Sequence, residues 1–173
     1  MEIVTKRLRL RQLQTGDASW LAREIANPLV QTWLTTPPHP YGVVDAESFI
    51  ANNSAAPLHR VIESAGSPLG VVSIGEARND VPDLGYWLAE HAWGHGYMTE
   101  AARALLNHAF AAGSKQISSG WITGNDASRK VLSKLGFEAD GRTETRSEFL
   151  DKTVTVEKVR MTAERWQTLR DAR

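Results

Sequence analysis

A helical stripe of apolar residues between positions 98 and 110 is the clearest periodic pattern in the chain. Its members recur at spacings of three and four residues, which brings them to one face of an α-helix. They are Met98, Ala101, Ala102, Leu105, Leu106, Ala109 and Phe110. Gly113 follows the stripe and predicts where this helix ends. A second stripe covers residues 18–26 and stops at Asn27-Pro28, so it predicts another helix.

Short apolar runs separated by turn residues predict the strands. The expected strands are residues 7–11, 58–63, 69–77, 84–89, 116–123, 142–150 and 153–161, with turns at 65–68 and 79–82. Further helices are expected at 45–53, 126–135 and 163–169, and Gly136 ends the second of these. Three prolines exclude regular structure from residues 35–42, because proline lacks an N–H donor and fixes φ.

The order of these elements is β-α-α-β-β-β-α-β-α-β-β, followed by the closing helix. It indicates an α/β protein with a mixed sheet, since hairpins alternate with helical crossovers. No internal repeat or linker divides the 173 residues, so we expect one domain over residues 1–173. A chain of this length buries roughly 70% of the surface that its unfolded form exposes, which is enough for one sizeable core.

Composition narrows the classes of partner. The 20 Lys and Arg residues balance 20 Asp and Glu, and a net charge of zero argues against binding to nucleic acid through many phosphates. The chain has no cysteine, which excludes disulfides, thiolate metal sites and cysteine nucleophiles. No apolar run approaches the roughly 18 residues that suggest a membrane span, and the first residues have no export-signal pattern. We therefore expect a cytoplasmic protein without a membrane or nucleic-acid partner.

The segment Trp93–Glu100 carries the strongest candidate chemistry. Gly94 and Gly96 stand just before the amphipathic helix. Glycine allows a close backbone approach and the first turn of a helix presents unpaired N–H groups, so this segment can hold a phosphate. An ordinary glycine turn after a strand is the alternative. No P-loop pattern occurs, and Thr99 stands where a dinucleotide-binding motif has its third glycine. The two nearby histidines lack a third ligand, so we expect no metal.

Several segments of the chain together resemble a known family. They are Thr5–Arg11, Asp83–Leu88, Trp93–Ala101, Asn125–Ser128 and Leu135–Phe137. In this order they resemble the GNAT superfamily of acyl-CoA-dependent N-acetyltransferases, and within it the RimJ/RimL-type branch, which includes acetyltransferases of ribosomal-protein N-termini. The resemblance covers nearly the whole chain. It implies a mostly antiparallel, twisted sheet flanked by helices, with two central strands that splay apart.

The resemblance also implies the residues that bind the cofactor. The backbone N–H groups expected to hold the pyrophosphate of acetyl-CoA are those of Gly94, His95, Gly96, Tyr97, Met98 and Thr99. Many members have Gln or Arg where this chain has Trp93, and Gly or Ala where it has Met98, but backbone donors survive these substitutions. Leu88 and Ala89, at the end of the preceding strand, are expected to pair with the pantetheine amides. Asn125 is expected to contact pantetheine.

Two residues are the candidates for catalysis. Many members carry a tyrosine acid later on the helix that Ser128 opens, where this chain has Val131 and Leu132. Ser128 is therefore the candidate donor to the thioester sulfur, with helix capping as its alternative role. Asp83 is the candidate base, acting through a water molecule, and Glu90 is a second candidate. The alternative for Asp83 is a solvated carboxylate at a strand edge.

The resemblance implies direct transfer of an acetyl group from acetyl-CoA to a primary amine, which belongs to a protein N-terminus or to a small molecule. Loop 35–42 is expected to line the acceptor site, with Trp33, His39, Tyr41 and Tyr86 as candidates and simple packing as their alternative. A non-catalytic acyl-CoA sensor with the same fold is the alternative function, since the helix tyrosine is missing. We expect a monomer or a homodimer.

Overall fold

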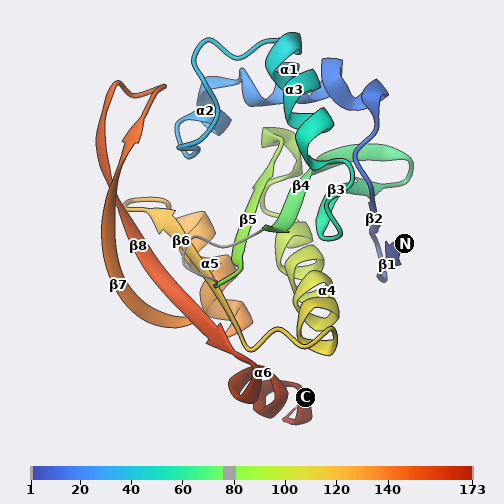
Figure 1. Cartoon of the computed structure of the whole chain (residues 1–173), viewed down its shortest axis with the longest axis vertical. Coiled ribbons are helices and arrows are strands. Elements are labelled where there is room, and N and C mark those ends of the chain that lie inside the picture. Colours follow the sequence, from blue (N-terminus) through green and yellow to red (C-terminus); the bar gives the residue numbers. More distant parts are fainter. Residues whose placement is uncertain (1, 76–80, 173) are drawn as a thin grey trace.

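Within residues 2–75 and 81–172, which the computed structural model describes, eight strands form one twisted sheet (Figure 1). The strands are β1 (Ile3–Val4), β2 (Arg9–Arg11), β3 (His59–Ser64), β4 (Ser67–Gly75), β5 (Asp83–Leu88), β6 (Gln116–Ile122), β7 (Glu138–Ser147) and β8 (Lys152–Thr162). Their order in the sheet is β1-β2-β3-β4-β5-β6-β8-β7. Every neighbouring pair is antiparallel except β5 with β6, so the mixed, mostly antiparallel sheet is confirmed.

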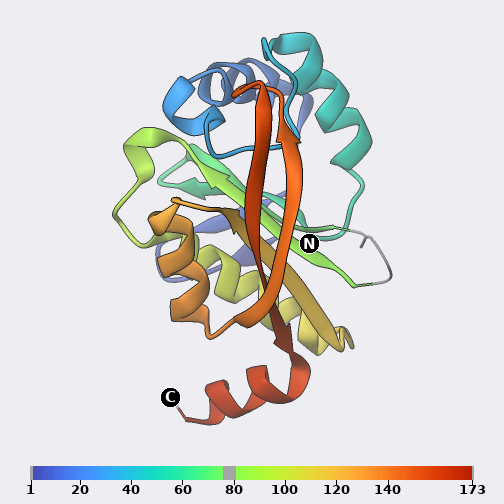
Figure 2. The ribbon, with the colours of Figure 1, turned by 90° about the vertical axis from the view of Figure 1, so that its left-hand side faces the viewer.

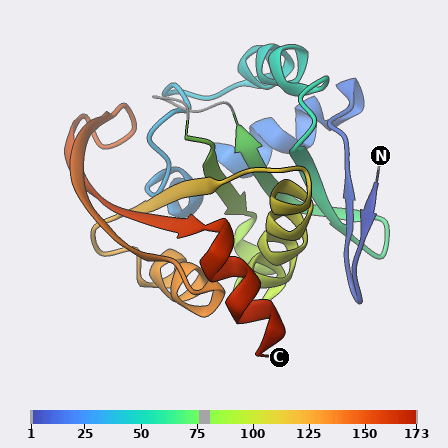
Figure 3. The same ribbon diagram turned by 60° about the horizontal axis from the view of Figure 1, so that its bottom comes forward.

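Helices cover both faces of this sheet. They are α1 (Ala18–Ile25), α2 (Pro28–Gln31), α3 (Val43–Asn53), α4 (Tyr97–Ala111), α5 (Asp126–Leu135) and α6 (Ala163–Asp171), with 3-10 turns η1 (Thr15–Asp17) and η3 (Glu90–Ala92). The helices α1 and α3 lie on one face, whereas α4 and α5 lie on the other and α6 projects beyond the end of β8 (Figures 1 and 3). None of the described helices is long and apolar enough to cross a membrane.

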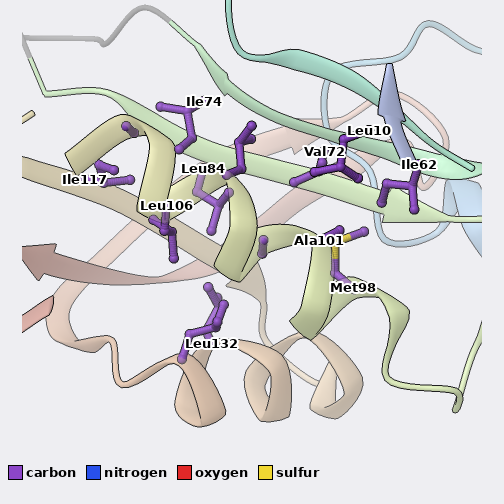
Figure 4. Close-up of a cluster of buried hydrophobic side chains, with 14 of the residues drawn as sticks. Leu10, Ile62, Val72, Ile74, Leu84, Met98, Ala101, Leu106, Ile117 and Leu132 are labelled. Carbon is purple, nitrogen blue, oxygen red and sulfur yellow. The ribbon is translucent and has the colours of Figure 1, made fainter. Parts of the chain in front are cut away.

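Each face of the sheet has its own hydrophobic core. Figure 4 shows the larger core, in which Leu84 of β5 and Ile117 of β6 meet Leu106 of α4. The predicted stripe of α4 supplies this core, and Leu105 and Leu106 are fully buried. The smaller core lies under α1 and α3, with Leu21, Ile50 and Val61 among its members. Alternate side chains of β5 therefore enter different layers.

The long hairpin β7–β8 leaves the plane of the sheet and rises along one side of the molecule (Figure 2). Its tip reaches the loop of residues 35–42, where the ring of Phe149 packs edge-on against His39 at 5.1 Å between ring centroids. This contact joins the hairpin to the segment between α2 and α3.

Element boundaries agree with the sequence prediction wherever apolar periodicity is strong. The helix α5 has the predicted bounds, and α4 extends the predicted stripe by one residue at each end. The short elements β1 and α2 were not predicted, because they span two and four residues. The strand β7 starts at Glu138 instead of 142, since its side chains are mostly exposed and show no apolar alternation. The ends of the predicted strand 69–77 and turn 79–82 fall in residues 76–80, outside the described residues.

A close contact between β4 and β5 provides a test of this packing. A Cβ atom added to Gly70 of β4 would overlap the carbonyl oxygen of Trp87 and stand 2.9 Å from Cα of Leu88. We expect Gly70→Ala to lower the free energy of unfolding by about 1–3 kcal/mol in urea denaturation, as overpacking does. The control is Gly85→Ala on β5, whose nearest contact would be Ser73 Oγ at 3.4 Å. Equal losses in the two variants would contradict this account.

Candidate active site

The parallel strands β5 and β6 touch at one point and then diverge. Their only register pair among the described residues is Asp83 with Ser118, where the Ser118 N–H donates to the Pro82 carbonyl at 2.8 Å. One residue further on, the Ser119 hydroxyl donates to the Leu84 carbonyl at 2.8 Å and replaces a backbone bond. The strands are apart beyond this point, so the expected splay is present and opens toward the end of β5.

The opening exposes backbone donors of β5. The Ala89 N–H donates to the Leu69 carbonyl of β4 at 2.8 Å. Because successive N–H groups of a strand point to opposite sides, those of Leu88 and Tyr86 point away from β4 and into the opening. An N–H group in this position needs a partner from water or a ligand.

Leu88 and Ala89 differ in what they can offer. Ala89 uses both backbone groups inside the protein, because its carbonyl also accepts the Ala92 N–H at 2.9 Å. The carbonyl of Leu88 accepts the indole N–H of Trp93 at 2.9 Å. The N–H of Leu88 is the backbone group that faces the opening. Trp93, which departs from the family pattern, therefore ties the end of β5 to residues 94–96, the glycine segment.

The glycine segment ends in an unusually open helix start. Gly96 is the N-cap of α4 with φ 76°, and Gly94 has φ 80°. Only glycine adopts this left-handed backbone freely. No side chain caps the helix, and the first intrahelical bond runs from the Glu100 N–H to the Gly96 carbonyl at 3.2 Å. The N–H groups of the first turn thus have no intrahelical partner, and such donors can hold an anionic group.

The segment before β2 holds the glycine segment in place. The Arg7 guanidinium donates to the His95 carbonyl at 2.9 Å and to Glu100 Oε2 at 2.7 Å, and it lies 4.8 Å from the ring centre of Tyr97. The Thr5 hydroxyl donates to Glu100 Oε1 at 2.6 Å. Burial raises the pKa of the Glu100 carboxyl, but the bonds from Thr5 and Arg7 more than offset this and hold the pKa below its usual value.

This tether was missed by sequence reasoning. Glu100 looks like an ordinary acidic residue of a first helical turn, and its partner Arg7 lies 93 positions earlier in the chain. The only sequence signal is the concentration of arginines at the start of the chain, which suggests an exposed strand face.

At the start of α5, helix capping and the candidate catalytic hydroxyl belong to different residues, which the sequence alone did not distinguish. The Asn125 side chain accepts the Ser128 N–H at 3.0 Å, so Asn125 is the capping residue. The Ser128 hydroxyl takes no part in capping and lies 2.8 Å from the phenol oxygen of Tyr86. Tyr86 was expected at the acceptor site, but its hydroxyl points to α5 instead. Burial raises the pKa of this phenol well above its usual value, although the bond from Ser128 lowers it somewhat.

Asp83 lies at the closed end of the opening. Its Oδ1 accepts the Ser118 hydroxyl at 2.6 Å and the Lys158 ammonium at 3.0 Å, while the side chain remains 46% exposed. Both of these bonds end on Oδ1. Asp83 precedes Tyr86 by three residues, or about 10 Å along the strand, and points to the opposite face. The structure therefore places the two candidate catalytic residues, Asp83 and Ser128, on opposite sides of the sheet.

The remaining acceptor-site candidates divide into packed and accessible residues. Tyr41 is buried in the core under α1 and α3, so packing explains it. His39 lies between Phe149 and Gln31, whose Oε1 is 3.2 Å from the His39 ring. Glu90 accepts the Asn27 amide at 2.9 Å. Trp33 is 37% exposed. The described residues contain no cluster of three acidic or histidine side chains that could hold a metal.

Comparison with known proteins agrees with this geometry. Residues 7–138 match the family model of the acetyltransferase (GNAT) domain. A curated relative from Bacillus licheniformis, the uncharacterized N-acetyltransferase p20, is 24% identical over 149 residues, which cover 80% of this chain and 83% of the relative.

Solved acetyltransferases share the fold. RimL, a ribosomal L7/L12 α-N-protein acetyltransferase solved with coenzyme A, has a TM-score of 0.82 and 20% identity, and the match covers 95% of this chain and 99% of RimL. The microcin C7 self-immunity acetyltransferase MccE, solved with acetyl-CoA and AMP, has a TM-score of 0.77 and 21% identity over 91% of this chain and 93% of MccE. The chain thus belongs to the acetyltransferase (GNAT) family.

Proposed function

We propose that residues 1–173 form one domain that transfers the acetyl group of acetyl-CoA to the primary amine of a protein N-terminus or a small molecule. The observation that carries this proposal is the divergence of β5 from β6 beside the first turn of α4. The strand offers N–H donors to an arm that contains amides, and the helix start offers them to an anionic head. Acetyl-CoA has both parts and supplies the acetyl group as a reactive thioester.

The glycine segment binds the pyrophosphate in this proposal. Gly94, His95 and Gly96 bring the backbone close to the phosphates, and the N–H groups of Tyr97, Met98 and Thr99 donate to them. Three observations support this role: both glycines have positive φ, the helix has no side-chain cap, and the first-turn donors have no intrahelical partner. The partial positive charge of the helix start adds to the attraction.

The opening between β5 and β6 receives the pantetheine arm and the thioester. The N–H of Leu88 pairs with the arm, and the N–H of Tyr86, the next one inward, is placed to polarise the thioester carbonyl as an oxyanion donor does. Asn125 uses its oxygen for capping, which leaves its amide N–H for the arm. Ala89 shapes the end of the strand without donating, since its backbone groups are engaged. Ser128 donates to the sulfur.

The acceptor enters from the face that bears α1, α2 and the β7–β8 hairpin. RimL acts on a protein N-terminus, and this supports the same kind of acceptor here. An α-amine has a pKa of about 7.7–8.0, so removal of its proton near pH 7 costs about 1 kcal/mol. A lysine amine has a pKa of about 10.4, and removal of its proton costs about 4.6 kcal/mol. An α-amine therefore needs little help from a base, and the partly exposed Asp83 is the candidate that supplies it.

A non-catalytic acyl-CoA sensor is the second candidate function. It is favoured by the absence of a tyrosine on α5, where Val131 and Leu132 stand, and by the ion pair that engages Asp83 with Lys158. A sensor would bind the same cofactor, so only turnover separates the two functions.

The glycine segment can be tested by substitution at Gly96. We expect Gly96→Val to weaken coenzyme A binding at least 100-fold in calorimetry, because a branched side chain disfavours the left-handed backbone and blocks the approach to the phosphates. Gly113→Val is the matched control, since Gly113 also has positive φ and open space but follows the other end of α4. Unchanged affinity in Gly96→Val would place the phosphate site elsewhere.

The reaction can be tested by thiol release from acetyl-CoA across a panel of acceptors. The panel holds peptides with free N-termini, the same peptides with blocked N-termini and a free lysine side chain, polyamines and aminoglycosides. We expect turnover with a free α-amine and at least tenfold less with the blocked peptides, because of the larger cost of neutralising lysine. Binding of coenzyme A without turnover of any acceptor would favour the sensor.

Asp83→Asn tests the base. If Asp83 accepts the amine proton, Asp83→Asn lowers kcat/KM about 100-fold, within the range for a lost proton transfer. Asp140→Asn is the control, because Asp140 is a similarly exposed carboxylate paired with Arg160 on the outer hairpin. A rate like that of the unsubstituted protein would exclude Asp83 as the base and leave it the role of joining β5 to β6 and β8.

A further inference from the structure

A partly buried tyrosine of β5 is hydrogen-bonded to the first turn of α5. The phenol oxygen of Tyr86 lies 2.8 Å from Ser128 Oγ and 3.3 Å from the Ser128 carbonyl oxygen, although the two residues are 42 positions apart. The Tyr86 ring packs against the larger core, so its position is set by its neighbours. This contact joins the strand that lines the opening to the helix that follows β6.

The hydroxyl of Ser128 is available for a second partner. Asn125 already accepts the Ser128 N–H, so capping makes no demand on the serine hydroxyl. A hydroxyl has one proton to donate and two lone pairs that accept. If the Tyr86 proton points at Ser128 Oγ, the serine proton is free for a group in the opening. If the Tyr86 proton points at the Ser128 carbonyl, the serine proton turns toward Tyr86 instead.

We propose that Tyr86 is a positioning residue that donates its O–H to Ser128 Oγ and so directs the Ser128 proton at the sulfur of the cofactor. This inference rests on the proposed function. The helix α5 has Val131 and Leu132 and no tyrosine of its own. In this inference Tyr86, a residue of β5, therefore helps to stabilise the departing thiolate.

The pair stabilises charge and gives up no proton. During transfer the amine forms the C–N bond, the C–S bond breaks with its electron pair going to sulfur, and water or Asp83 accepts the amine proton. Burial raises the pKa of the Tyr86 phenol, while a thiol ionises near 8.5, so the phenol keeps its proton beside a thiolate. Tyr86 and Ser128 therefore act as a chain of two donors, each polarising the next.

The test reads the ionisation of bound coenzyme A, which needs neither an acceptor nor turnover. Thiolate absorbs in the ultraviolet where thiol does not, so a pH titration of the complex gives the pKa of the bound thiol. We expect the unsubstituted protein to hold this pKa below that of free coenzyme A. Tyr86→Phe, which keeps the ring and removes the hydroxyl, should raise it by about one unit, or tenfold in acidity, with the Kd for coenzyme A within about twofold.

Three further variants make the result specific. Ser128→Ala should raise the thiol pKa at least as much, and the double variant should match Ser128→Ala alone, because residues that act as a unit are not additive. Ser133→Ala is the control, since Ser133 is exposed on the same helix. With an active acceptor, Tyr86→Phe should lower kcat about tenfold at nearly constant KM for acetyl-CoA. Thermal unfolding shows which variants remain folded.

The outcomes separate this inference from the proposed function. If the unsubstituted protein binds no coenzyme A, the proposed function fails and the inference fails with it. If coenzyme A binds and the thiol pKa is the same with and without the Tyr86 hydroxyl, the inference alone is overturned. Additive shifts in the double variant would also overturn it, because they mean that the two hydroxyls act independently. If Tyr86→Phe does not fold, an unchanged thiol pKa in Ser128→Ala decides against the inference.

Discussion

The structure depends on a parallel pair of strands that is joined at one end only. Among the described residues, a single register pair, Asp83 with Ser118, connects β5 to β6, and one side-chain bond from Ser119 follows it. Beyond that point β5 keeps N–H donors without a strand partner, which would be costly if they were buried and dry. A sheet with such a gap is favourable only if water or a ligand fills it. The position of the gap therefore determines where an arm rich in amides can bind.

In the proposed site, backbone groups explain how a chain without net charge can bind an anionic cofactor. The 20 basic and 20 acidic residues cancel, yet the helix start of α4 presents donors and a partial positive charge that formal charge does not count. Arg7 is bound to the His95 carbonyl and to Glu100, so the glycine segment is held before any ligand arrives. A segment ordered in advance loses less conformational entropy on binding.

Local patterns in the sequence determined much of the fold and part of the site. The stripe of α4 predicts its own burial, since a helix with one apolar face must pack that face. The positive φ of Gly96 and the capping role of Asn125 are local properties, and both follow from residue type and position. The class of sheet and the glycine segment could be predicted for the same reason. The first residues of β7 could not, because their exposed side chains show no apolar alternation.

Contacts between distant segments were decided only by the tertiary structure. The tether from Arg7 to Glu100 and the bond from Tyr86 to Ser128 join residues that no local pattern relates. Tyr86 has the residue type of an acceptor-site aromatic, and only the alternation of β5 between two cores turns its hydroxyl toward α5. Sequence periodicity states which face of an element is buried, but not which element it meets. The choice of partner depends on how all the layers pack together, and this packing put the two hydroxyls side by side.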